Sequence, residues 1–101
     1  MGDVGDAVLS TVSNAARLLK EFRSREASIG VSELARRLGL GKSGVHRLLT
    51  TLVAEGLLER DANTGGYRLG IVMFELGEAV KVHLDLHAAA GPVLAQLREQ
   101  T

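Results

Sequence analysis

The sequence predicts a mainly α-helical domain with one small β-hairpin. Three segments before residue 56 carry apolar residues at helical spacing, which is typical of amphipathic helices. Two short strand-like runs then flank a stretch of turn-forming residues, which is the pattern of a hairpin. The chain has 101 residues, of which 46% are hydrophobic, so its size and composition suit one compact domain.

The first helix is expected from about Ser10 to Arg23. Its apolar stripe consists of Val12, Ala15, Ala16, Leu19 and Phe22, and Leu18 widens it. Residues 1–9 are rich in Gly and Asp and are expected to form a disordered N-terminus. In the connection after the helix, Ser28 to Gly30 could pair as a very short strand.

Two more helices follow in close succession. Ser32 is expected to cap the second helix, which stops at Gly39 because glycine adopts a positive φ without steric cost. The third helix is expected to begin after Gly41 and to end at Glu55, with Gly56 as its C-terminal stop. Its buried stripe is Val45, Leu49 and Leu52, joined by Leu48.

The spacing of four residues in this region is typical of a helix-turn-helix. Ala35, Gly39, Val45 and Leu48 occupy offsets 0, 4, 10 and 13. A small alanine lets the two helices meet closely, and the glycine lets the chain reverse. In such a motif the second helix enters the major groove of DNA.

The outward side of the third helix is polar or small near its start. Its residues are Lys42, Ser43, Gly44, His46 and Arg47. Arg47 can bind a guanine edge or a phosphate, Ser43 can bond to either, and Lys42 suits a phosphate. His46 could do the same or only cover the flank of the helix, and Gly44 would permit close approach. The alternative is an ordinary solvated face.

The predicted hairpin consists of Leu57–Arg60 and Tyr67–Leu69, joined by residues 61–66. Three helices followed by a hairpin make a winged helix-turn-helix over residues 10–70. The tip and base of the wing carry the candidate DNA contacts Asn63, Thr64, Arg60 and Arg68, and the alternative is a plain turn with solvated arginines.

The second helix normally crosses the phosphate backbone, so Ser32 and Arg36 are candidate contacts as well. Arg17 and Arg37 are expected to be ordinary surface charge. The formal net charge is zero, but between Arg17 and Arg68 ten basic residues face six acidic ones. The excess of four positive charges therefore lies on the segment that carries the motif.

The composition gives little support to other classes of function. The chain has no cysteine, which fits a reducing compartment, and the start of the sequence does not suit a signal peptide. No apolar stretch approaches the length of a membrane span. No cluster of titratable groups suggests a catalytic, cofactor or metal site. We therefore expect a cytoplasmic protein that is not an enzyme.

Residues 71–101 are expected to form linker and dimerisation helices, because they hold too many apolar residues for an isolated surface helix. A turn is expected around His83–Leu86 with Asp85 as a cap. A second helical stretch should follow to Thr101, with a kink or restart at Pro92.

Four segments together resemble the N-terminal domain of IclR-type bacterial transcription regulators. They are G-L-G-K-S-G-V-H-R-L-L-T-T-L from Gly39 to Leu52, E-G-L-L-E-R-D from Glu55 to Asp61, Y-R-L-G from Tyr67 to Gly70 and F-E-L-G from Phe74 to Gly77. The resemblance extends from about Leu9 to Thr101. This chain has Gly41 where the family usually has Pro, and Gly44 where it usually has Thr.

The resemblance implies a homodimer that binds a pseudo-palindromic operator in duplex DNA. It also implies a C-terminal effector domain, absent from this chain, that binds a small molecule, often an organic or aromatic acid. The alternative is a winged-helix module for protein–protein dimerisation without DNA binding, as at the N-termini of some methyltransferases. An apolar outward face on the third helix would favour that alternative, whereas a basic and polar face favours DNA.

Overall fold

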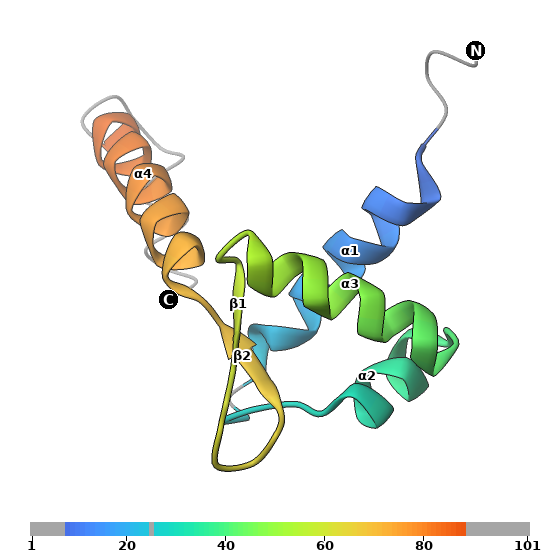
Figure 1. Cartoon of the computed structure of the whole chain (residues 1–101). Helices are drawn as coiled ribbons and strands as arrows, with labels where there is room; N and C mark the ends of the chain where they lie inside the picture. Colours follow the sequence, from blue (N-terminus) through green and yellow to red (C-terminus); the bar gives the residue numbers. More distant parts are fainter. Residues whose placement is uncertain (1–7, 25, 89–101) are drawn as a thin grey trace.

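The computed structural model describes residues 8–24 and 26–88 (Figure 1). The elements in order are α1 (Ser10–Lys20), the 3-10 turn η2 (Glu21–Arg23), α2 (Val31–Leu38), α3 (Lys42–Ala54), β1 (Leu58–Arg60), β2 (Tyr67–Leu69) and α4 (Ile71–Ala88). The predicted combination of helices with one antiparallel hairpin is confirmed. Residues 1–7, most of the N-terminal segment expected to be disordered, lie outside the described residues.

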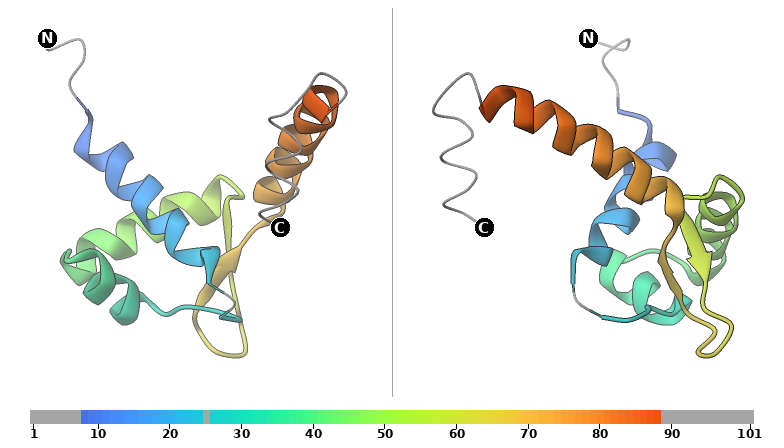
Figure 2. Two further views of the ribbon diagram at one scale, coloured as in Figure 1. Left: turned by 180° about the vertical axis from the view of Figure 1, so that it is seen from behind. Right: turned by 90° about the vertical axis from the view of Figure 1, so that its left-hand side faces the viewer.

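One apolar core joins the three N-terminal helices to the hairpin. Its buried members are Leu18, Ile29, Leu34, Ala35, Leu38, Val45, Leu49, Leu52, Leu58 and Tyr67. Helix α3 crosses α1, and α2 lies beside the N-terminal end of α3 (Figures 1 and 2). The stripe predicted for α3 is therefore buried as expected, and burial of this apolar surface is the main force that fixes the helix.

The turn between α2 and α3 depends on Gly39. This residue has φ of +68°, in the left-handed region that glycine adopts without a Cβ clash. The Leu40 N–H donates to the Ala35 carbonyl at 3.1 Å, and the Gly39 N–H donates to the Arg36 carbonyl at 3.3 Å. This pair of bonds is a Schellman motif, which ends α2 and turns the chain into α3.

The hairpin is attached to the helices through Tyr67. Its backbone N–H donates to the Ile29 carbonyl at 2.8 Å, and its carbonyl accepts from the Ile29 N–H at 2.9 Å. The expected short strand at Ile29 is therefore confirmed as an isolated bridge. The Tyr67 side chain is buried, so backbone pairing and side-chain burial together hold the wing against the domain.

Three sequence-based expectations were wrong. Helix α2 begins at Val31, two residues earlier than a cap at Ser32 predicts, because the Gly30 carbonyl accepts the first helical bond from Leu34. Ser32 lies inside the helix and caps nothing. Val12 and Ala16 of the predicted stripe are exposed, and Leu18 is instead the fully buried residue of α1. No turn occurs at residues 83–86: α4 continues to Ala88, because nothing between Gly77 and Ala88 is a Gly or Pro and one Asp does not end a helix.

Helix α4 is fixed to the domain only at its start. The Gly70 N–H donates to the Leu57 carbonyl at 2.9 Å, and the Val72 N–H donates to the Gly56 carbonyl at 3.2 Å. Beyond this attachment α4 projects away from the other helices (Figure 2). The expected helical stretch with a kink at Pro92 lies outside the described residues. In the described part of the chain, no helix has both the length and the apolar character needed to cross a bilayer.

Replacement of Gly70 by Ala is expected to destabilise the domain. A Cβ at this position would lie 2.4 Å from the Gly56 carbonyl oxygen, so the backbone would have to move. We expect a loss of about 1–3 kcal/mol in the free energy of unfolding, measured by urea titration. As a control, Gly77→Ala on α4 meets no atom within 4 Å and should not destabilise. Equal stability of the two variants would contradict this account.

Candidate nucleic-acid interface

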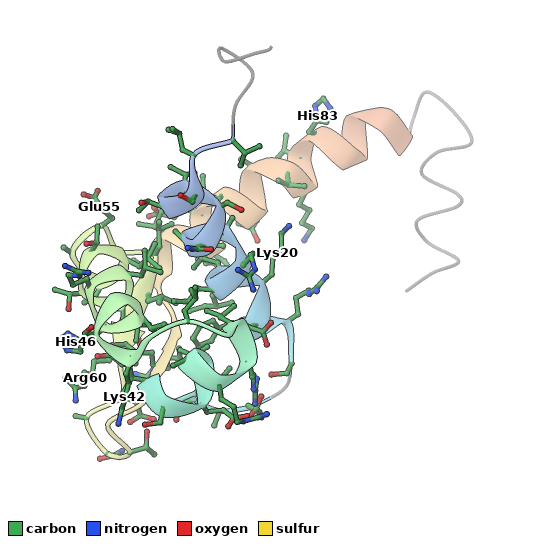
Figure 3. All side chains as sticks on the ribbon, turned by 90° about the vertical axis from the view of Figure 1, so that its right-hand side faces the viewer. Lys20, Lys42, His46, Glu55, Arg60 and His83 are labelled. Atoms are coloured by element: carbon green, nitrogen blue, oxygen red, sulfur yellow. The ribbon has the colours of Figure 1, made fainter. Side chains whose placement is uncertain are left out.

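The inner and outer sides of α3 differ as the sequence predicts. Val45 and Leu49 are fully buried, whereas Ser43 and Arg47 are exposed. Lys42 and His46 are exposed as well, and Gly44 is half-buried. Figure 3 shows Lys42 and His46 on one side of the molecule together with Arg60 of the hairpin. The exposed surface at the start of α3, which we call the α3 face, is therefore polar and basic.

The cations of the α3 face have no acidic partner. Within the described residues, the side chains of Lys42 and Arg47 make neither an ion pair nor a hydrogen bond. Most arginines elsewhere in the domain bond to carboxylates or backbone carbonyls. An exposed cation without a carboxylate partner is free to neutralise a phosphate from outside the protein, and it need not break an internal contact first.

Arg37 is the centre of an ion network, not the ordinary surface charge that the sequence indicated. Its guanidinium lies 2.8 Å from carboxylate oxygens of Glu26 and Glu33, and 3.7 Å from Glu21. Arg36 also bonds to Glu33. Hydrogen bonds from Arg36 and then Arg37 lower the pKa of Glu33 to about 2. The network joins α2 to η2 and to the segment after it, and it occupies the predicted contact Arg36.

The two predicted arginines of the wing lie on opposite sides of the hairpin. The register pairs Glu59 with Arg68 and Arg60 with Tyr67, and neighbouring residues of a strand point to opposite faces. Arg68 lies 2.6 Å from Glu59 and 3.5 Å from Asp61, so its charge is neutralised within the wing. Arg60 makes no ion pair in the described chain and lies 5.4 Å from the centre of the Tyr67 ring.

The tip of the wing is held by local hydrogen bonds. The Thr64 hydroxyl lies 2.9 Å from the Ser28 hydroxyl and accepts from the Gly66 N–H at 3.1 Å. The Asn63 N–H donates to an Asp61 carboxylate oxygen at 2.9 Å, and this bond lowers the pKa of the Asp61 carboxyl. Thr64 is therefore already bonded to the rest of the domain, whereas the Asn63 side chain is exposed.

Two grooves flank the α3 face. The wing groove, of about 310 Å³, lies between α3 and the hairpin and is lined by His46, Thr50, Val53, Arg60 and Tyr67. The α1 groove, of about 450 Å³, lies between α1 and α3 and is lined by Thr11, Asn14, Leu40, Gly41, Gly44, Arg47, Leu48 and Thr51. No carboxylate lines either groove, so both can accept an anionic ligand.

Several residues of this surface were not predicted from the sequence. Thr50 is exposed one helical turn beyond His46 and Arg47, a spacing that the outward pattern of α3 could have indicated. Thr11 and Asn14 could not be found from local pattern, because α1 and α3 meet only in the tertiary structure. Arg17 was expected to be surface charge, but it donates to the Leu38 carbonyl at 2.9 Å and ties α1 to the end of α2.

The described residues contain no group of three His, Cys, Asp or Glu side chains that could hold a metal ion. No polar or charged side chain of the described residues is fully buried, Tyr67 apart. The chemistry of the site is accordingly that of an exposed surface with hydrogen-bond donors, fixed cations and shallow grooves.

Comparison with known proteins identifies a family. The model of the IclR helix-turn-helix domain matches residues 11–62. The transcriptional regulator KipR of Bacillus subtilis is 39% identical over 87 residues, which cover 86% of this chain and 34% of the relative. The chain therefore spans about a third of the length of the curated relatives it matches.

Solved structures agree with this comparison. An IclR family transcriptional regulator from Brucella abortus matches with a TM-score of 0.68 and 34% identity, over 79% of this chain and 30% of that one. An IclR homologue from Microbacterium hydrocarbonoxydans, solved in complex with 4-hydroxybenzoate, matches with a TM-score of 0.60 and 32% identity, over 65% and 27% of the two chains. These structures have the predicted winged-helix fold.

Glu33→Gln is expected to make the stability of the domain less dependent on pH. The pKa of Glu33 is lowered from an ordinary 4.5 to about 2, so its carboxylate stabilises the folded state above pH 4.5, and this contribution is lost as the pH falls to about 2. The difference in urea midpoint between wild type and variant should therefore shrink over that range. Glu55→Gln removes a carboxylate without an ion pair in the described chain and serves as the control; the same pH profile for both variants would contradict the assignment.

Proposed function

The chain belongs to the IclR helix-turn-helix domain family of DNA-binding transcription regulators, and from this membership we propose that it reads a DNA operator as a homodimer. In the proposed complex α3 enters the major groove and the wing lies on the adjacent backbone or in the minor groove. The observation that carries the proposal is the α3 face, where Lys42 and Arg47 are exposed without an acidic partner.

Each residue of the α3 face has a role that follows from its chemistry. Arg47 contacts a guanine edge or a phosphate, and Ser43 bonds to either. Lys42, in the first turn of the helix, binds a phosphate. His46 lies beside the wing groove and contacts the flank of the site. Gly44 has open space around it and lets the DNA approach the helix closely.

The predicted DNA contacts outside α3 fall into two groups, those that are free of internal bonds and those already bonded within the domain. Arg60 is the wing cation that binds DNA, because it has no carboxylate to leave, and Asn63 joins it at the exposed tip. Arg68 and Thr64 act mainly by fixing the wing, to Glu59 and to Ser28. Ser32 and Arg36 lie exposed on α2 at the edge of the interface, where Arg36 would share its charge between Glu33 and a phosphate.

The dimer is proposed to form through α4. Ile71, Phe74, Leu76, Val80 and Val82 are each more than half exposed on this helix, which projects from the domain. So much uncovered apolar surface is typical of an association site. Two copies would then address half-sites about one turn of DNA apart (~34 Å), or a multiple of it.

Regulation by a small molecule is proposed for a protein that joins this domain to a C-terminal domain, since the matched residues cover only 34% of the relative KipR. The Microbacterium homologue bound to 4-hydroxybenzoate suggests an aromatic acid as the class of effector. Its site is assigned to a C-terminal domain outside these 101 residues. The alternative of a protein–protein module using α3 is disfavoured by the basic and polar character of the α3 face.

Arg47→Ala and Lys42→Ala are expected to weaken DNA binding in different ways. The probe is a duplex that the wild-type chain selects from a random pool. If Arg47 contacts a base, Arg47→Ala lowers affinity by about 1–3 kcal/mol and relaxes the preference at one base pair. Lys42→Ala should weaken selected and scrambled duplexes alike and reduce the salt dependence of binding by about one phosphate.

Arg23→Ala is the matched control, because it removes an exposed cation whose side chain bonds to the Lys20 carbonyl, away from the α3 face. Its effect on affinity should be small. Equal binding of selected and scrambled duplexes by the wild-type chain would refute the proposed sequence recognition.

Phe74→Glu is expected to shift the chain from dimer to monomer. A buried carboxylate at an apolar contact is strongly unfavourable, so the sedimentation equilibrium mass should fall toward that of one chain. Glu75→Lys changes a neighbouring exposed residue of α4 and is the control. A wild-type chain that stays monomeric at all concentrations with and without DNA would contradict the proposed dimer.

A further inference from the structure

The α1 groove lies on the side of α3 away from the wing, and its polar groups are not explained by the fold. Thr11 and Asn14 of α1 face Gly44, Arg47 and Thr51 of α3 across it. A Cβ on Gly44 would meet no atom within 4 Å, so the middle of the groove is open. The groove is therefore a concave surface with polar side chains on both walls and an unpaired cation, Arg47, on one of them.

The hydrogen bonds of these side chains show which of them can donate to a ligand. The Thr51 hydroxyl already donates to the Arg47 carbonyl at 2.9 Å. Asn14 Oδ1 accepts from Arg17 Nη1 at 3.1 Å, and Arg17 Nη2 donates to the Leu38 carbonyl at 2.9 Å. This chain of bonds fixes the Asn14 amide and leaves its NH2 group as a donor.

The Thr11 hydroxyl makes no hydrogen bond with the described part of the chain. The free groups along the groove are accordingly two neutral donors, from Thr11 and Asn14, and the Arg47 guanidinium. With no carboxylate among the lining residues, this set suits the oxygens of an anion.

The width of the DNA major groove indicates which anion can reach the α1 groove of the protein. An α-helix with its side chains is about 10–12 Å across and the major groove is about 12 Å wide, so a helix in it has a sugar–phosphate backbone close on each side. With α3 in the major groove, the wing groove, lined by Arg60 and His46, would face one of these backbones. The α1 groove lies on the opposite side of the same helix and would then face the other backbone.

We propose that the α1 groove seats the DNA strand across the major groove from the wing, with Thr11 and Asn14 donating hydrogen bonds to its phosphates. The inference rests on the proposed function, since it requires α3 to lie in the major groove. Arg17 acts as a positioning residue that orients Asn14 through the bond to Oδ1. The two grooves then contact both strands, the α1 groove through the neutral donors Thr11 and Asn14 beside Arg47 and the wing groove through Arg60.

The test uses the 101-residue chain and the duplex that it selects from a random pool. Thr11→Val removes the hydroxyl at nearly constant shape and should weaken binding roughly two- to tenfold, the value of one hydrogen bond. Because a neutral donor releases no counterion, the slope of log affinity against log salt should not change. Arg60→Ala on the opposite side should reduce that slope by about one.

Thr11→Asp places a negative charge against the phosphates, and Ala16→Asp adds the same charge to an exposed position of α1 that does not line the groove. Affinity should fall at least about tenfold further for Thr11→Asp than for Ala16→Asp. Thermal melting followed by circular dichroism checks that each variant is folded. If Thr11→Asp does not fold, the affinity of Thr11→Val alone tests the proposed contact. Equal affinity of wild type and Thr11→Val would overturn the proposal.

Phosphate-ethylation interference assigns the strands. With Thr11→Val, interference should disappear at phosphates on one strand, and with Arg60→Ala at phosphates on the other. Loss on the same strand for both variants would overturn the inference while leaving major-groove binding intact. A wild-type chain that selects no sequence and shows no interference would instead refute the proposed function itself.

Discussion

The burial of one side of α3 determines how the recognition surface of the domain is oriented. Val45, Leu49 and Leu52 pack into the core formed by α1, α2 and the hairpin. Since a helix is rigid about its axis, the rotation that buries these residues also determines that Ser43 and Arg47 face outward. The turn at Gly39 sets the direction from which α3 leaves α2. A substitution that weakens this packing would therefore change the orientation of the recognition surface even though every contact residue stays the same.

Charge is distributed so that internal pairing and external binding use different cations. Arg37 has three glutamates around it and Arg68 has two acidic neighbours, so these charges hold the scaffold together. Lys42, Arg47 and Arg60 have no acidic partner in the described chain, and Lys42 and Arg60 lie on the same side of the molecule (Figure 3). A chain with zero net charge can thus present a locally basic surface, because its acidic residues are engaged or placed elsewhere.

The wing and α4 are connected to the same point of the fold. Gly56 and Gly70 approach so closely that a Cβ on Gly70 would meet the backbone of Gly56. The end of α3, the root of the hairpin and the start of α4 therefore share one tightly packed junction. In the proposed dimer this junction would fix the direction of α4 relative to α3. The spacing of the two DNA half-sites would then depend on the geometry of a single domain.

The order of the elements, the buried stripe of α3 and its outward residues could be predicted from the amino-acid sequence, because they depend on helical periodicity and on glycines with local conformational roles. The sequence also indicated the family, through motifs that lie close together along the chain. Its predictions were wrong at Ser32 and at residues 83–86, where a cap residue was given more weight than the continuing helix.

Which cations are free depends on contacts that form when the chain folds. Arg60 and Arg68 both flank the turn of the hairpin, and the sequence does not distinguish their roles. The strand register places Arg60 opposite Tyr67 and Arg68 opposite Glu59. The α1 groove likewise depends on residues more than thirty positions apart, Thr11 and Gly44 among them. Ion pairs and grooves arise from contacts between elements distant in the chain, and no local pattern of residue types specifies such contacts.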